Sequence, residues 1–226
     1  MNNRYVVVGC TQWARDIFNK TICKFPGKWY YIDGAEPVVL VNDIAGHEPR
    51  FVFFLHWREK VNSELLNKFE CVNFHMTDLP YGRGGSPLQN LIEYGHKETV
   101  LTAHRMVEEV DAGPVYLKKK LSLEGSAADI YKRAMGLAVE MIKMIVAVEP
   151  IPEEQEGEPF FFTRRTPDMS RIERKPSLER LYDFIRMLDA PGYPAAFIEH
   201  MGFRYEFGAA KISDSGIEAT VKIREI

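Results

Sequence analysis

The stretch F-V-F-F-L at Phe51–Leu55 decides the expected fold of this 226-residue chain. A continuous apolar run with three aromatic residues is typical of a strand in a parallel sheet that is covered on both faces. The run ends at His56-Trp57, and Asn62 to Phe69 is then expected to be a helix. Cys71 to His75 is the next strand-like run. Strands that alternate with helices in this way predict an open α/β sheet.

The flanking sequence continues the same pattern. Tyr5 to Val8 is a β-branched run that stops at Gly9, and Thr11 to Lys20 has the character of a helix. No G-x-G-x-x-G loop follows the first strand, so a dinucleotide cofactor has little support. We therefore expect a Rossmann-like α/β fold with a mostly parallel sheet. Further expected elements are strands at Val38–Val41, Thr99–Met106 and Val115–Leu123 and helices at Pro87–Tyr94 and Ser126–Val148.

The composition changes at Glu149. Glu149 to Pro159 contains three prolines and five glutamates, which is typical of a linker or surface excursion. A helix at Leu178–Leu188 and a hairpin formed by Phe203–Phe207 and Ile217–Ile223 follow. The sequence thus predicts a catalytic domain over residues 1–150 and a small C-terminal α+β subdomain over residues 151–226.

The composition is that of an ordinary globular protein, 46% apolar and 27% charged, with a net charge of -3. This charge argues against extended contact with nucleic acid. No apolar window is long enough to span a membrane, and no signal peptide precedes the first strand. Three cysteines without C-x-x-C spacing favour a reducing compartment and no structural zinc. We expect a cytoplasmic protein that binds neither membrane nor metal.

Asn73, His75 and Asp111 are the candidate catalytic residues. Asn73 and His75 end one expected strand, where open sheets collect ligands, and Asp111 begins the turn between two later strands. A neutral histidine near a carboxylate is a poised general base. The amide of Asn73 could stabilise an oxyanion. Together these groups suit acyl transfer to an amine without a protein nucleophile.

Simpler interpretations remain open for each residue. A lone histidine at a strand end is more often structural than catalytic, and Asp111 before Ala-Gly could be only a turn carboxylate. Trp57 could be a packed aromatic residue, and the loop at Arg83 could be only a surface loop. The chain could also be a binding protein that has lost catalysis on the same scaffold.

The joint pattern resembles a known family. Asn73-x-His75, Leu79-Pro80, Arg83-Gly84, Pro87 and Asp111-x-Gly113 together resemble the formyltransferases that use 10-formyltetrahydrofolate. The resemblance implies that Asn73, His75 and Asp111 are catalytic. It also implies a folate cleft between the loop after His75 and the turn at Asp111. The cofactor-binding residues that follow from it are Leu79, Pro80, Asp111 and Gly113.

Further motifs, including Phe54-x-His56-Trp57 and Tyr193-Pro194-x-Ala196-Phe197, resemble the sugar N-formyltransferase branch. That branch implies a nucleotide-linked amino sugar as acceptor, for example a dTDP- or UDP-linked 4-amino-4,6-dideoxyhexose of a surface glycan. Trp57 and Arg83 would then hold the nucleotide or its phosphates. Family members are often dimers through the C-terminal region, which the apolar hairpin would suit.

Two other acceptors stay open. The same motifs resemble formylation domains of nonribosomal peptide synthetases, which act on a carrier-bound aminoacyl group. A methionyl-tRNA formyltransferase is the third option, although such enzymes usually carry a further domain and a basic surface. The short and acidic chain favours the sugar enzyme.

Overall fold

The computed structural model describes residues 3–34, 40–173 and 177–226, and these group into two compact units. Unit 1 contains the described residues of Met1–Gly84, Val100–Lys120 and Lys132–Phe161. Unit 2 contains those of Gly85–Thr99, Leu121–Tyr131 and Phe162–Ile226. The domain boundary near residue 150 stays a prediction.

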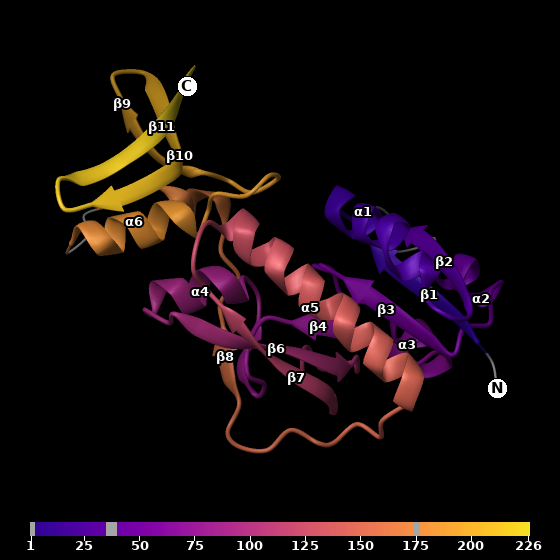
Figure 1. Ribbon diagram of the computed structural model, residues 1–226. Helices are drawn as coiled ribbons and strands as arrows, with labels where there is room; N and C mark the ends of the chain where they lie inside the picture. The colour runs from indigo at the N-terminus through magenta and orange to yellow at the C-terminus, as the bar shows by residue number, and fades with distance from the viewer. Residues whose placement is uncertain (1–2, 35–39, 174–176) are drawn as a thin grey trace. The chain divides into compact units, whose positions relative to one another are not determined.

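A six-stranded sheet with the order β2-β1-β3-β4-β6-β7 organises the larger part of the chain before residue 150 (Figure 1). The first four strands in this order pair in parallel, and β6 pairs antiparallel with β4. This arrangement confirms the expected α/β fold with a mostly parallel sheet. The strands are β1 Arg4–Gly9, β2 Lys28–Asp33, β3 Phe51–Leu55, β4 Cys71–His75, β6 Glu98–Arg105 and β7 Val115–Ser122.

Strand β3 lies at the centre of the sheet, between β1 and β4. All five of its residues are buried, because helices and loops cover both faces of the sheet at this point. Phe54 packs into a cluster with Val6 and Val8 of β1, to which helix residues Ile44 and Leu65 contribute. The apolar run that predicted the fold is therefore the middle of the core.

The expected helices are present. Thr11 caps α1 by accepting the N–H of Ala14 at 3.3 Å, and Asn62 caps α3 by accepting the N–H of Glu64 at 2.8 Å. Figure 1 shows the long helix α5 running across one face of the sheet. Among the described residues, no helix is long and apolar enough to span a membrane. The helices are α1 Gln12–Lys20, α2 Leu40–Ala45, α3 Ser63–Lys68, α4 Pro87–Glu93, α5 Ala127–Val148 and α6 Leu178–Arg186, with 3₁₀ turns at Ile22–Lys24 and Pro167–Ser170.

Two short elements differ from the sequence-based expectation. The strand expected at Val38–Val41 is wrong for Leu40 and Val41, which begin α2, while residues 38–39 lie outside the described part. An apolar run of four residues does not separate a strand from a buried helix segment. Strand β2 at Lys28–Asp33 was not expected, because its alternation is weak at the edge of the sheet.

Unit 2 contains α6 and a three-stranded sheet with the order β11-β10-β9. The strands are β9 Ala196–His200, β10 Phe203–Ser213 and β11 Gly216–Glu225. β10 and β11 pair antiparallel, which confirms the expected hairpin. The register Ile198–Tyr205–Ile223 places the exposed Ile198, Val221 and Ile223 on one face of this sheet.

Phe53→Ala should lower the free energy of unfolding by about 3–5 kcal/mol, because Phe53 is fully buried in the central strand and its removal leaves a cavity. Phe161→Ala is the matched control, since Phe161 is 59% exposed. Urea denaturation of both variants measures the difference. Similar losses for the two variants would contradict the central position of β3 in the core.

Candidate active site

The end of strand β4 and the facing part of β6 carry the candidate site. Residues two apart on a strand point to the same face, so Asn73 and His75 share one face of the sheet. The antiparallel register pairs Asn73 with His104 and His75 with Thr102. Four polar side chains from two neighbouring strands therefore gather on one face, all within unit 1.

The imidazole of His75 is buried, with 6% of the residue exposed. Its Nε2 lies 2.7 Å from the carbonyl oxygen of Gly82, and its Nδ1 lies 3.5 Å from Oδ2 of Asp111. A carbonyl oxygen only accepts hydrogen bonds, so Nε2 carries the hydrogen and the neutral ring keeps its lone pair on Nδ1. Burial lowers the pKa of His75, and the charge of Asp111 and the Gly82 carbonyl raise it only in part. The ring is thus a neutral base at neutral pH.

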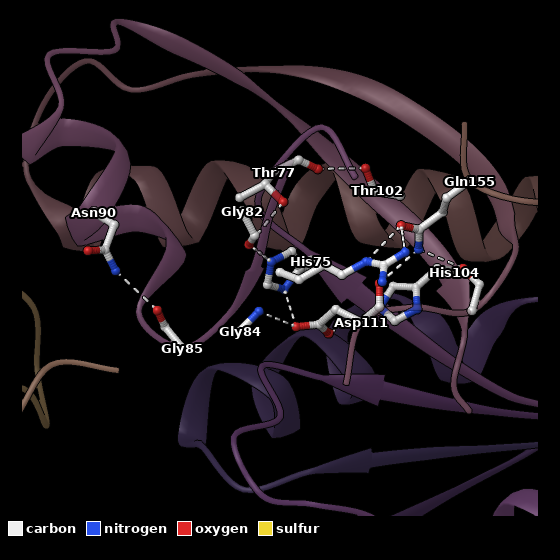
Figure 2. A network of polar contacts seen from close by, with 12 residues as sticks. His75, Thr77, Gly82, Gly84, Gly85, Asn90, Thr102, His104, Asp111 and Gln155 are labelled. Carbon is white, nitrogen blue, oxygen red and sulfur yellow. Dashed lines mark hydrogen bonds and ion pairs between the residues drawn. The ribbon is translucent and has the colours of Figure 1, made fainter. Parts of the chain in front are cut away.

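Asp111 lies between two histidines (Figure 2). Its Oδ2 accepts the N–H of Gly84 at 3.0 Å, and its Oδ1 lies 3.5 Å from Nε2 of His104. Burial raises the pKa of Asp111, but His75, His104 and the Gly84 N–H outweigh it and lower the pKa to about 2. The carboxylate therefore stays ionised beside His75.

Asn73 is half-buried, and its side chain makes no hydrogen bond to the residues that the structure describes. Its amide is thus available to a ligand that approaches His75 from the same face. The structure brings His75 and Asp111 into contact and places Asn73 on the neighbouring position of that face.

The residues expected to bind the cofactor offer main-chain rather than side-chain groups. Leu79 is buried, and its carbonyl accepts the ammonium of Lys118 at 2.7 Å. The carbonyl of Pro80 accepts the N–H of Phe160 at 3.2 Å. Gly113 packs so closely that a Cβ there would lie 1.9 Å from the carbonyl oxygen of Arg105. Their role as folate ligands stays a prediction.

The two expected substrate ligands have protein partners. Trp57 packs edge-on against Phe54, with ring centroids 5.2 Å apart, and its buried Nε1 has no hydrogen-bond partner in the described part of the chain. Arg83 donates to Gln155 at 2.9 and 3.1 Å and to Glu109 at 3.1 Å. Their role as substrate ligands stays a prediction.

Sequence reasoning missed His104 and Gln155. His104 is 2% exposed and was overlooked because it sits inside a strand-like run, although it shares the alternation of Thr102 and precedes the Asp111 turn. Gln155 donates to the carbonyls of Asp111 and Gly113, each at 2.8 Å. No local pattern marks Gln155, because its contacts are distant in sequence.

The segment expected to be a linker is ordered along this site. Val115 donates to the carbonyl of Glu153 at 2.6 Å, and Glu153 donates back at 2.9 Å. Farther along, β8 Phe160–Phe162 pairs with β5 Tyr81–Gly84. Prolines and glutamates predicted an excursion, yet pairing with β5 and β7 holds these residues beside the Asp111 turn.

Two parts of the chain match known protein families. Residues 34–145 match the family described as formyl transferase, and residues 167–224 match the methionyl-tRNA formyltransferase C-terminal domain. A methionyl-tRNA formyltransferase from Clostridium thermocellum is 36% identical, with 98% of this chain and 99% of that chain covered and a TM-score of 0.90.

More distant structures share the fold. HypX from Aquifex aeolicus in complex with tetrahydrofolic acid is 14% identical, with 93% of this chain and 38% of that chain covered and a TM-score of 0.77. A 4-N formyltransferase from Francisella tularensis is 16% identical, with 99% and 98% covered and a TM-score of 0.66. The donor expected from the sequence, formyl-tetrahydrofolate, is the one that the formyl transferase family uses. Because its identity to the Clostridium thermocellum enzyme extends over 98% of its length, the chain belongs to the formyltransferase family.

Proposed function

We propose that this enzyme transfers the formyl group of 10-formyltetrahydrofolate to the amino group of a nucleotide-linked amino sugar, such as a dTDP- or UDP-linked 4-amino-4,6-dideoxyhexose. The reaction joins the amine nitrogen to the formyl carbon and breaks the bond from that carbon to the folate nitrogen. The observation that carries the proposed chemistry is the buried contact between Nδ1 of His75 and the ionised Asp111.

His75 removes the proton of the attacking amine. The lone pair on Nδ1 accepts it, and the imidazolium that results donates to the Gly82 carbonyl and faces the Asp111 carboxylate. The Gly82 carbonyl and the Asp111 carboxylate both stabilise the positively charged ring that forms when the proton is transferred. His75 then returns this proton to the departing folate nitrogen, with Asp111 keeping the ring in place.

Asn73 stabilises the formyl oxygen. Its amide N–H donates to that oxygen as negative charge develops, together with the protonated ring of His75 on the same face. A donor held by a buried strand needs little rearrangement during the reaction, because the backbone around Asn73 is fixed by β3 and β6. Such a preorganised donor is worth about 10²–10³-fold in turnover.

The folate would contact main-chain groups of the loop at Leu79–Pro80 and of the turn from Asp111 to Gly113. The absence of a Cβ at Gly113 lets this turn pack against β6 and leaves its backbone close to the site. Trp57 and Arg83 are the proposed contacts for the nucleotide or its phosphates, and Arg83 would exchange Glu109, which is largely exposed, for a phosphate.

The charge pattern of unit 2 supports a small acceptor rather than tRNA. Binding to a polyanion relies on lysines and arginines that are free to contact phosphates. Five arginines of unit 2 instead pair with carboxylates. The pairs are Arg165–Glu93, Arg171–Glu199, Arg186–Asp183, Arg204–Glu199 and Arg224–Glu206.

Methionyl-tRNA is the second candidate acceptor. It is favoured by the Clostridium thermocellum relative, whose name states this activity and which is matched over 99% of its length. Since a protein of similar length is named a methionyl-tRNA formyltransferase, chain length does not distinguish methionyl-tRNA from an amino sugar as the acceptor. A homodimer through unit 2 is a further part of the proposal, supported by the exposed apolar face of Ile198, Val221 and Ile223.

His75→Asn should lower kcat by about 10²–10⁴-fold while the protein stays folded, because the base is lost and an amide remains that can bond to Gly82. Steady-state kinetics and circular dichroism measure the two effects. His47→Asn is the matched control, since His47 stacks on Tyr30 away from the sheet's catalytic edge. Unchanged turnover in His75→Asn would remove His75 from the mechanism.

Asp111→Asn should lower kcat and move the acid limb of the kcat–pH profile to lower pH. The carboxylate raises the pKa of His75, so its removal lowers that pKa and the ring stays unprotonated to a lower pH. In the wild type this limb should fall below the ordinary histidine pKa of 6.5, since burial dominates. If the acid limb does not move in Asp111→Asn, the charge of Asp111 does not influence the pKa of His75.

Incubation with 10-formyltetrahydrofolate and separate acceptors should yield a formylated product with a nucleotide-linked 4-amino sugar. Mass spectrometry detects the product, and methionyl-tRNA and a carrier-bound aminoacyl thioester serve as competing acceptors. Formylation of methionyl-tRNA alone, with a strong dependence on salt, would replace the sugar by the tRNA as substrate.

A further inference from the structure

The side-chain amide of Gln155 uses all of its hydrogen-bonding capacity inside the candidate site (Figure 2). Its two N–H groups donate to the carbonyls of Asp111 and Gly113, each at 2.8 Å. Its oxygen accepts hydrogen bonds from Nε and Nη2 of Arg83, at 3.1 and 2.9 Å. A neutral amide with two donors and two acceptor positions matches this set, whereas a carboxylate or an apolar group does not.

These contacts join the two pieces of chain that hold the catalytic pair. Arg83 belongs to β5, in which Gly82 accepts from His75 and Gly84 donates to Asp111. Gln155 links Arg83 to the backbone of the turn that carries Asp111. The contacts therefore form a closed ring from the imidazole through β5 and Gln155 to the carboxylate and back.

The turn needs such support because Asp111 has a positive φ of 54°. A non-glycine residue in this region persists when its surroundings fix it. The hydrogen bonds from Gln155 fix the carbonyl of Asp111 itself and that of Gly113, one residue beyond Ala112. The segment that carries Gln155 is in turn fixed by the pairing of Val115 with Glu153.

We propose that Gln155 is a positioning residue for formyl transfer, which holds the Asp111 turn so that the carboxylate faces Nδ1 of His75. This inference rests on the proposed function, since it acts through the roles given to His75 and Asp111. Gln155 acts through the Asp111 turn, because its hydrogen bonds set the distance between base and carboxylate. The segment after α5 is thereby part of the catalytic apparatus.

Two variants test the hydrogen bonds of Gln155, one by removing all of them and one by removing only the two that it donates. Gln155→Met keeps the length of the side chain and removes all four hydrogen bonds. Gln155→Glu keeps an acceptor for Arg83 but cannot donate to the carbonyls of Asp111 and Gly113, which its charge repels. Glu154→Gln is the matched control, because Glu154 is an exposed neighbour in the same segment. Thermal unfolding establishes that each variant is folded.

Both variants should lower kcat by about 10–100-fold, since misplacement of a catalytic group by a small distance is costly in turnover. In Gln155→Met, which adds no charge, the acid limb of kcat should also move to lower pH, in the direction expected for Asp111→Asn. A merely structural residue would not move this limb. Glu154→Gln should match the wild type in kcat and in pH profile.

A double-mutant cycle decides whether Gln155 acts through Asp111. Added to Asp111→Asn, Gln155→Met should lower kcat by less than about twofold further, because the group that it positions is already neutral. Full additivity, or an unchanged kcat and pH profile in both Gln155 variants, would overturn the inference while leaving the proposed function intact. Undiminished kcat in Asp111→Asn alone would overturn the role of Asp111 and the inference with it.

Discussion

The contact between the buried imidazole of His75 and the carboxylate of Asp111 is the constraint on which the rest of the site depends. A buried charge is costly unless it is paired and hydrogen-bonded. Asp111 accepts the N–H of Gly84, and its oxygens lie 3.5 Å from Nδ1 of His75 and from Nε2 of His104. These three residues belong to β5, β4 and β6, so the three strands and the Asp111 turn must all be in place together. The site is therefore stable only as a unit.

The sheet explains how segments distant in sequence reach this point. β4 and β6 pair antiparallel, and this register sets Asn73 opposite His104 and His75 opposite Thr102. The turn after β6 then returns along the same edge and carries Asp111 to the imidazole. Buried β3 fixes β4 from the other side, so the apolar run at Phe51–Leu55 supports the candidate site.

Much of this arrangement could be predicted from local sequence. The continuous apolar run of β3, the helices α1 and α3 and the alternating hairpin at the C-terminus each depend on neighbouring residues. The family motif singled out Asn73, His75 and Asp111 as candidates because their spacing is distinctive, and the structure brings His75 and Asp111 together. His104 and Gln155 could not be found in this way. Their contacts depend on strand register and on a segment whose prolines and glutamates resemble a linker.

Strand β7 has a consequence for assembly. It is the last strand of the six-stranded sheet, and an edge strand offers unpaired backbone groups to other chains. Glu153 covers its first residue, and three consecutive lysines, Lys118 to Lys120, follow along the strand. Lys118 pairs with Asp78 and Lys119 with Glu140, and charged side chains along an edge strand disfavour its pairing with a second molecule. The charged residues of β7 and the cover from Glu153 thus disfavour extension of the sheet into aggregated, strand-paired polymers.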